Sequence, residues 1–223
     1  MIHVFIIIFQ FKPSLLYGRF KQKYICWAGK MIDTAQQKKL VMGLAAATFI
    51  GMPAIAWLIA GWTDVSMYER LRAGGPLLLQ LAVGVVAGGC IGMLAQWLVE
   101  RDFMQEATSR YQDMFGALRL EQGERIFLSL SAGVGEEILF RGAVQPLLGI
   151  WPTAIMFIAL HGYLNIRSWR ISVYGGVMTV MIALLGYLAE WMGIWSAVAA
   201  HTVIDLFLLQ QMETRRVTFR ELD

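Results

Sequence analysis

Two adjacent glutamates and an arginine interrupt an apolar stretch of the chain, "GVGEEILFRG" at residues 133–142. Arg141 follows Glu137 by four residues, which places the two on one face of a helix. Glu136 points about 100° away from Glu137, because a helix turns by that angle per residue. One carboxylate can therefore pair with Arg141 while its neighbour faces a different group.

Two histidines stand in apolar segments further along the chain. His161 has Phe157 one turn before it, and His201 has Asp205 one turn after it on the same helical face. A carboxylate at that spacing can fix the ring orientation and tautomer of a histidine. Either histidine alone is compatible with a structural role. Ionisable residues from three separate apolar segments instead predict one shared functional site.

Glutamate and histidine in one site permit two related chemistries. Glu136, His161 and His201 could bind zinc as three ligands and leave one position open for water. Alternatively, a glutamate assisted by one histidine could act as general base on water, while the other histidine and Asp205 stabilise an oxyanion. Both routes hydrolyse an amide.

The other nucleophile types lack a comparable setting. Ser129 and Ser131 precede the glutamates as small helix-packing residues. Cys26 and Cys90 offer neither a disulfide framework nor metal-ligand spacing.

The composition predicts that these residues lie in a membrane. The chain is 57% hydrophobic and 16% charged, with a formal net charge of +3, whereas a soluble domain has about 25% charged residues. That small net charge gives no indication of nucleic-acid binding. Six apolar segments predict an all-α, polytopic bundle of about six transmembrane helices. They cover residues 40–62, 76–99, a stretch from about Ile126, 151–166, 171–189 and 193–212.

The basic residues that flank these segments predict the orientation. Only Arg70 and Arg72 lie on one side. Eleven lie on the other: Lys38, Lys39, Arg101, Arg110, Arg119, Arg125, Arg167, Arg170, Arg215, Arg216 and Arg220. We therefore expect a multi-pass protein of the cell inner membrane with both termini in the cytoplasm. Glu136 then lies roughly 15 Å from the cytoplasmic end of its helix, near the bilayer centre.

The chain divides into three expected parts. Residues 1–39 form a cytoplasmic N-terminal extension, 40–212 the intramembrane domain and 213–223 a cytoplasmic tail. The first thirty residues contain basic but no acidic side chains. They can be interpreted as a targeting segment or, as we favour, as sequence upstream of a natural start at Met31. The polar stretch 100–125 includes an expected amphipathic, interfacial helix.

Three motifs resemble those of a known family. "EEILFRG" (136–142), "FIALH" (157–161) and "HTVID" (201–205) occur in order. They are similar to the Glu-Glu-x-x-x-Arg, Phe-x-x-x-His and His-x-x-x-Asn/Asp motifs of the CAAX-protease and bacteriocin-processing family, also called CPBP or Abi. The resemblance covers roughly residues 76–212 and implies an all-α intramembrane endopeptidase.

The resemblance also implies residue roles. Glu136 would activate water with the help of His161, and Glu137 and Arg141 would hold the site together. His201 and Asp205 would stabilise the oxyanion. Asp205 replaces the asparagine of many members, and an ionised aspartate cannot donate a hydrogen bond, so orienting His201 is its alternative role.

Two further functions stay open at this point. Bacterial relatives include immunity proteins, so a non-proteolytic immunity or scaffold protein is the alternative to a protease acting on a membrane-associated peptide or protein. A transporter that relays protons would be expected to show internal repeats, and the sequence has none.

Overall fold

The computed structural model describes residues 24–27, 30–101, 118–164 and 169–220, with side chains described for 35–101, 118–164 and 172–210. The interfacial helix expected within 100–125 falls mostly outside these ranges. The described elements are β1 (Tyr24–Trp27), β2 (Lys30–Asp33), α2 (Thr34–Gly61), α3 (Met67–Arg72), α4 (Leu77–Val99), α6 (Gln122–Glu137), the π-helix η1 (Ile138–Val144), α7 (Gln145–Leu148), α8 (Ile150–Leu160), α9 (Trp169–Met192) and α10 (Ile194–Arg220).

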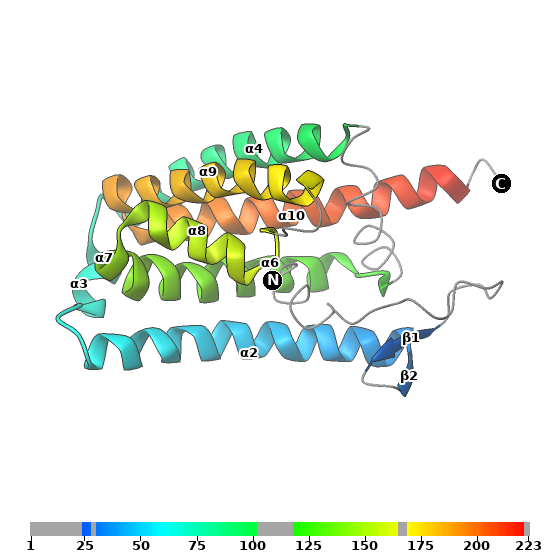
Figure 1. Cartoon of the computed structure of the whole chain (residues 1–223), viewed down its shortest axis with the longest axis horizontal. Coiled ribbons are helices and arrows are strands. Elements are labelled where there is room, and N and C mark those ends of the chain that lie inside the picture. The colour runs from blue at the N-terminus through cyan, green and yellow to red at the C-terminus, as the bar shows by residue number, and fades with distance from the viewer. Residues whose placement is uncertain (1–23, 28–29, 102–117, 165–168, 221–223) are drawn as a thin grey trace.

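The long helices lie side by side in one bundle, as predicted (Figure 1). The first residues of α2 and the last residues of α10 lie toward the same end of the bundle, and α3 and α7 lie at the opposite end. Apart from the antiparallel hairpin β1–β2, the described fold is all-α. Helix α2 begins six residues before the expected boundary at residue 40, and α10 continues through most of the segment expected to be a tail.

Three of the described helices are long and apolar enough to cross a membrane: Ala35–Gly61, Leu77–Val99 and Ser172–Met192. Shorter apolar helices cover Ile150–Leu160 and Ile194–Gln210. The prediction of a full span over 151–166 is wrong in extent, since α8 has 11 residues and is about 16 Å long. Gly162 adopts a φ of 76° immediately after it, a left-handed conformation that ends a helix.

The interface between α4 and α10 is built from small residues. Gly84, Gly88 and Gly92 are buried and recur every four residues along one face of α4. A Cβ on Gly88 would lie 2.5 Å from the carbonyl oxygen of Ala200, so the two backbones touch there. Close helix contacts of this kind are typical of bundles in lipid.

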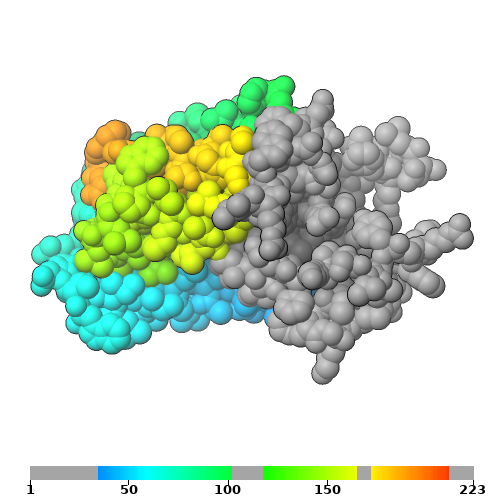
Figure 2. Space-filling model, in the orientation of Figure 1, coloured from blue at the N-terminus to red at the C-terminus, as the bar shows by residue number. Residues whose placement is uncertain are grey.

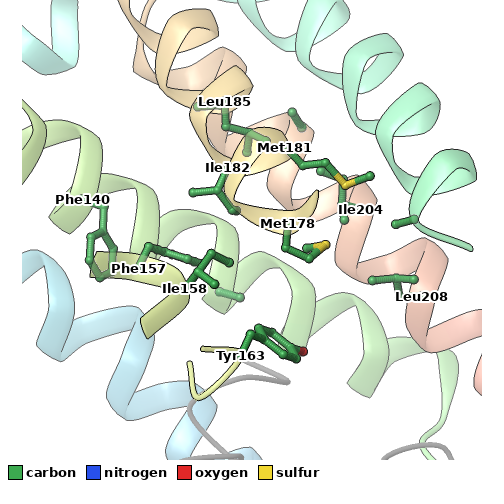
Figure 3. Packing of buried hydrophobic residues seen from close by; sticks show 14 of the residues in the cluster. Phe140, Phe157, Ile158, Tyr163, Met178, Met181, Ile182, Leu185, Ile204 and Leu208 are labelled. Carbon is green, nitrogen blue, oxygen red and sulfur yellow. The ribbon is translucent and has the colours of Figure 1, made fainter. Parts of the chain in front are cut away.

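The apolar core lies between α6, α8, α9 and α10. Figure 3 shows Phe140 beside Phe157, and Ile182 and Leu185 of α9 facing them. The two phenyl rings pack edge to face with centroids 4.8 Å apart. On the face drawn in Figure 2, α8 and the described part of α9 form one packed surface above α2. This core fixes the helices that carry the polar residues of the candidate site.

Helix α6 begins at Gln122, before the expected start near Ile126, because a capping box forms there. The Glu121 side chain accepts the backbone N–H of Glu124, and Glu124 Oε2 accepts the N–H of Glu121 at 2.7 Å. Lys38 of α2 also contacts Glu124 Oε2 at 2.7 Å. The helix then widens into η1 directly after Glu137. The spacing argument for Glu137 and Arg141 assumed an α-helix, whereas Arg141 lies in the π-helix.

Candidate active site

Glu137 and Arg141 form a fully buried ion pair, as their spacing predicts. Arg141 Nε donates to Glu137 Oε2 at 2.8 Å, and both side chains have zero exposure. Arg141 Nη2 also donates to the carbonyl oxygen of Ile182 at 3.0 Å, on α9. A buried charge needs such partners, because an isolated one is strongly destabilising.

Glu136 faces away from this pair and toward the two histidines. Its Oε2 lies 3.6 Å from His161 Nε2 and 3.8 Å from His201 Nε2. All three side chains are buried. The prediction that residues of the third, fourth and sixth segments converge is confirmed by these distances.

In each imidazole, the nitrogen that does not face Glu136, Nδ1, donates a hydrogen bond to a fixed acceptor. His161 Nδ1 donates to the carbonyl oxygen of Phe157, and its ring stacks on the Phe157 ring with centroids 4.0 Å apart. His201 Nδ1 donates to Glu137 Oε1 at 2.8 Å. Since carbonyl and carboxylate oxygens only accept, Nδ1 carries a proton in both rings. The Nε2 atoms are therefore left to act toward Glu136.

His161 and Asp205 differ from expectation in placement. His161 is the C-cap residue of α8 rather than an interior helical residue, because the helix ends before Gly162. Glu137 makes the hydrogen bond to His201 Nδ1, and the alternative role of Asp205 in orienting His201 stays a prediction. Asp205 Oδ2 instead lies 3.9 Å from His201 Nε2, on the side of the ring that faces Glu136.

The expectation that Glu136, His161 and His201 bind zinc stays a prediction. Among the described residues, no group of three His, Cys, Asp or Glu side chains is arranged to hold a metal ion. Ligand atoms of a tetrahedral zinc ion lie ~3.3 Å apart, given bonds of about 2.0–2.1 Å. The distances of 3.6 and 3.8 Å from Glu136 Oε2 to the two Nε2 atoms exceed that spacing. We therefore derive the chemistry from the side chains alone.

A polar chain that sequence reasoning missed extends from Arg141 toward the end of the bundle that carries α3. Arg141 Nη1 donates to Gln145 Oε1 at 3.0 Å, and Gln145 Nε2 donates to Glu190 Oε1 at 2.8 Å. Arg70 of α3 pairs with the same Glu190 oxygen at 2.8 Å. These partners are 45 and 120 positions apart in the sequence, so no local spacing connects them. The only local signal was a glutamine four residues after Arg141.

The comparisons with known proteins agree with the site. Residues 124–207 match the family described as "Type II CAAX prenyl endopeptidase Rce1-like", and this part of the chain is a domain of that family. The matched range contains all six predicted site residues.

One similar protein is the uncharacterized protein YpbD of Bacillus subtilis (strain 168). It is 33% identical over 93 residues, which cover 41% of this chain and 47% of YpbD. The chain thus spans less than half the length of this curated relative. No solved structure matches. Together with the three apolar helices, the family domain identifies a membrane protein.

Proposed function

We propose that this protein is an intramembrane endopeptidase that hydrolyses a peptide bond of a membrane-associated protein or peptide. The observation that carries the proposal is the position of Glu136 Oε2 between the Nε2 atoms of His161 and His201. A carboxylate and an imidazole nitrogen are the side-chain groups best suited to take a proton from water near neutral pH.

The proposed reaction has two proton transfers. Glu136, assisted by His161, takes a proton from a water molecule while the water oxygen bonds to the scissile carbonyl carbon. The C–N bond then breaks as the protonated Glu136 returns that proton to the leaving nitrogen. The products are a new carboxyl group and a new amine, and the enzyme ends in its starting state.

His201 is proposed to stabilise the oxyanion of the tetrahedral intermediate. Glu137 accepts from its Nδ1–H and so supports a positively charged ring, whose Nε2–H can donate to the oxyanion. Asp205 Oδ2 lies 3.9 Å from the same nitrogen and is proposed to help hold the ring in this position.

The topology is proposed to be six passes with both termini cytoplasmic. Support comes from the eleven-to-two bias of the flanking basic residues. The first residues of α2 and the last residues of α10 also lie toward one end of the bundle (Figure 1). Reporter fusions at Gly149 and Met192 are then expected outside, and fusions after Arg170 inside. A C-terminal fusion that reports the outer face would contradict this orientation.

The function is tested with purified protein in proteoliposomes and a set of membrane-anchored peptides. Mass spectrometry in water enriched in 18O should find fragments that carry one solvent oxygen at the new carboxyl group. A variant with alanine at both His161 and His201 is the control for contaminating proteases. Cleavage should persist after rigorous metal removal. Activity that returns only with zinc would favour the metal route, and no cleavage of any peptide would favour a non-proteolytic immunity or scaffold role.

A further inference from the structure

The polar chain beyond Arg141 ends far from the reacting atoms, yet it is buried and fully bonded over most of its length. Gln145 is 2% exposed. Its Oε1 accepts from Arg141, and its Nε2 donates both to the carbonyl oxygen of Gly186 at 3.1 Å and to Glu190. Both amide protons are therefore used, which leaves one orientation for this side chain.

Helix α9 has a gap in its side-chain surface at the point where Gln145 docks. A Cβ on Gly186 would lie 2.7 Å from Gln145 Oε1, 2.8 Å from Ile150 Cγ2 and 3.4 Å from Arg141 Nη1. The carbonyl oxygens of Ile182 and Gly186, one turn apart, accept from Arg141 and Gln145 respectively. The absence of a side chain at Gly186 thus permits both contacts.

The far end of the chain is anchored by two oppositely charged side chains. Arg70 Nη2 donates to Glu190 Oε1 and, at 3.1 Å, to the carbonyl oxygen of Arg141 itself. Arg70 and Glu190 are 23% and 37% exposed, so this end lies at the bundle surface. Arg141 is consequently held from both its side chain and its backbone.

We propose that Gln145 and Gly186 are positioning residues of the active site, which act through Arg141 and Glu137 on His201. The predicted effect on the cleavage rate rests on the proposed function. Arg141 holds one oxygen of Glu137, and the other oxygen of Glu137 holds Nδ1 of His201. If Gln145 no longer fixes the guanidinium, Glu137 loses its defined position. The Nε2 atom of His201 then no longer points steadily at the reacting group.

Two variants remove this support in different ways, and each has a matched control. Gln145→Leu deletes the hydrogen bonds, and Gln80→Leu is its control. Gln80 is an equally buried glutamine with bonds to Ala73, Gly75 and Trp195 but none to the polar chain. Gly186→Ala keeps the glutamine at position 145 but pushes its amide group out of the observed position. Its control is Gly176→Ala on the same helix, where a Cβ meets nothing within 4 Å.

The first measurement is steady-state cleavage in proteoliposomes. Gln145→Leu and Gly186→Ala should each lower kcat about tenfold with KM unchanged, as is typical when the support of a catalytic side chain is lost. The two control variants should keep kcat. If Gln80→Leu loses as much kcat as Gln145→Leu, the effect is general destabilisation and the inference is overturned.

The second measurement needs no activity. The chain has three histidines, so a protein labelled with 15N-histidine gives few ring signals, and single substitutions assign them. The His201 Nδ1–H signal should be strongly downfield in the wild type. It should move upfield or broaden in Gln145→Leu and Gly186→Ala but not in the controls.

These two measurements separate failure of the inference from failure of the proposed function. A protein without peptidase activity can still show the change at His201, which would support the positioning chain alone. An unchanged His201 signal in both variants overturns the inference even if the peptidase is active. If Gln145→Leu does not fold, Gly186→Ala decides the question.

Discussion

Two of the helix interfaces in the described part of this bundle are held together by opposite means. Between α4 and α10, glycines and alanines bring backbones into contact. Between η1 and α9, fully buried charged and amide groups bond to one another and to helix carbonyl oxygens. The first kind of contact depends on shape. The polar contact between η1 and α9 also fixes the direction of each donor and acceptor. The residues proposed to be catalytic lie next to this polar interface.

The largest expected effect comes from breaking the buried ion pair. Arg141→Leu leaves Glu137 charged and without its main partner in an apolar setting, which costs about 3–5 kcal/mol. The yield of monodisperse protein and its thermal stability in detergent should fall sharply.

A double variant sharpens that result. Glu137→Gln combined with Arg141→Leu removes both charges and keeps an acceptor for His201 Nδ1, so most of the lost stability should return while cleavage stays impaired. A single Arg141→Leu variant as stable as the wild type would show that the interface does not depend on this pair.

A smaller effect is expected at the glycine interface. Gly88→Ala places a Cβ 2.5 Å from the carbonyl oxygen and 2.8 Å from the Cα of Ala200, so the backbones must separate, at a cost of about 1–3 kcal/mol. Gly89→Ala, where a Cβ meets nothing within 4 Å, is the matched control and should be neutral or slightly stabilising. Thermal unfolding in one detergent measures both. Equal stability of the two variants would argue against close packing of α4 on α10.

The smallest effect concerns the start of α6, outside the apolar spans. Burial raises the pKa of Glu124, but hydrogen bonds from Lys38 and the Glu121 N–H outweigh it, so the pKa lies below the usual value. Since the pKa of Glu124 is lower in the folded than in the unfolded protein, its carboxylate stabilises the fold fully above the unfolded pKa of about 4.3. This stabilisation is lost as the pH falls through the folded pKa.

Glu124→Gln should therefore be less stable than the wild type at pH 7, by no more than about 1 kcal/mol for so exposed a pair. The difference should disappear in acid. Unfolding curves across that pH range test this, and a difference that persists below the pKa of Glu124 would contradict it.

The sequence predicted much of the site because charge is so costly in an apolar segment. Because of that cost, Glu136, His161 and His201 could be predicted to converge on one site. The four-residue spacing predicted the Glu137–Arg141 ion pair. The π-helix was missed because its residues have no distinctive local preference. The roles of Gln145, Glu190 and Arg70 were missed because they depend on contacts between distant helices. The early end of α8 did have a signal, the glycine directly after His161.

The measurement that tests the central claim most directly is the cleavage rate of Glu136→Gln. This change keeps the size of the side chain and removes the carboxylate that would take a proton from water. Cleavage should fall to background, whereas the fraction of folded protein and its thermal stability should stay near wild-type values. A Glu136→Gln variant that cleaves a membrane-anchored peptide at the wild-type rate would contradict the proposed mechanism.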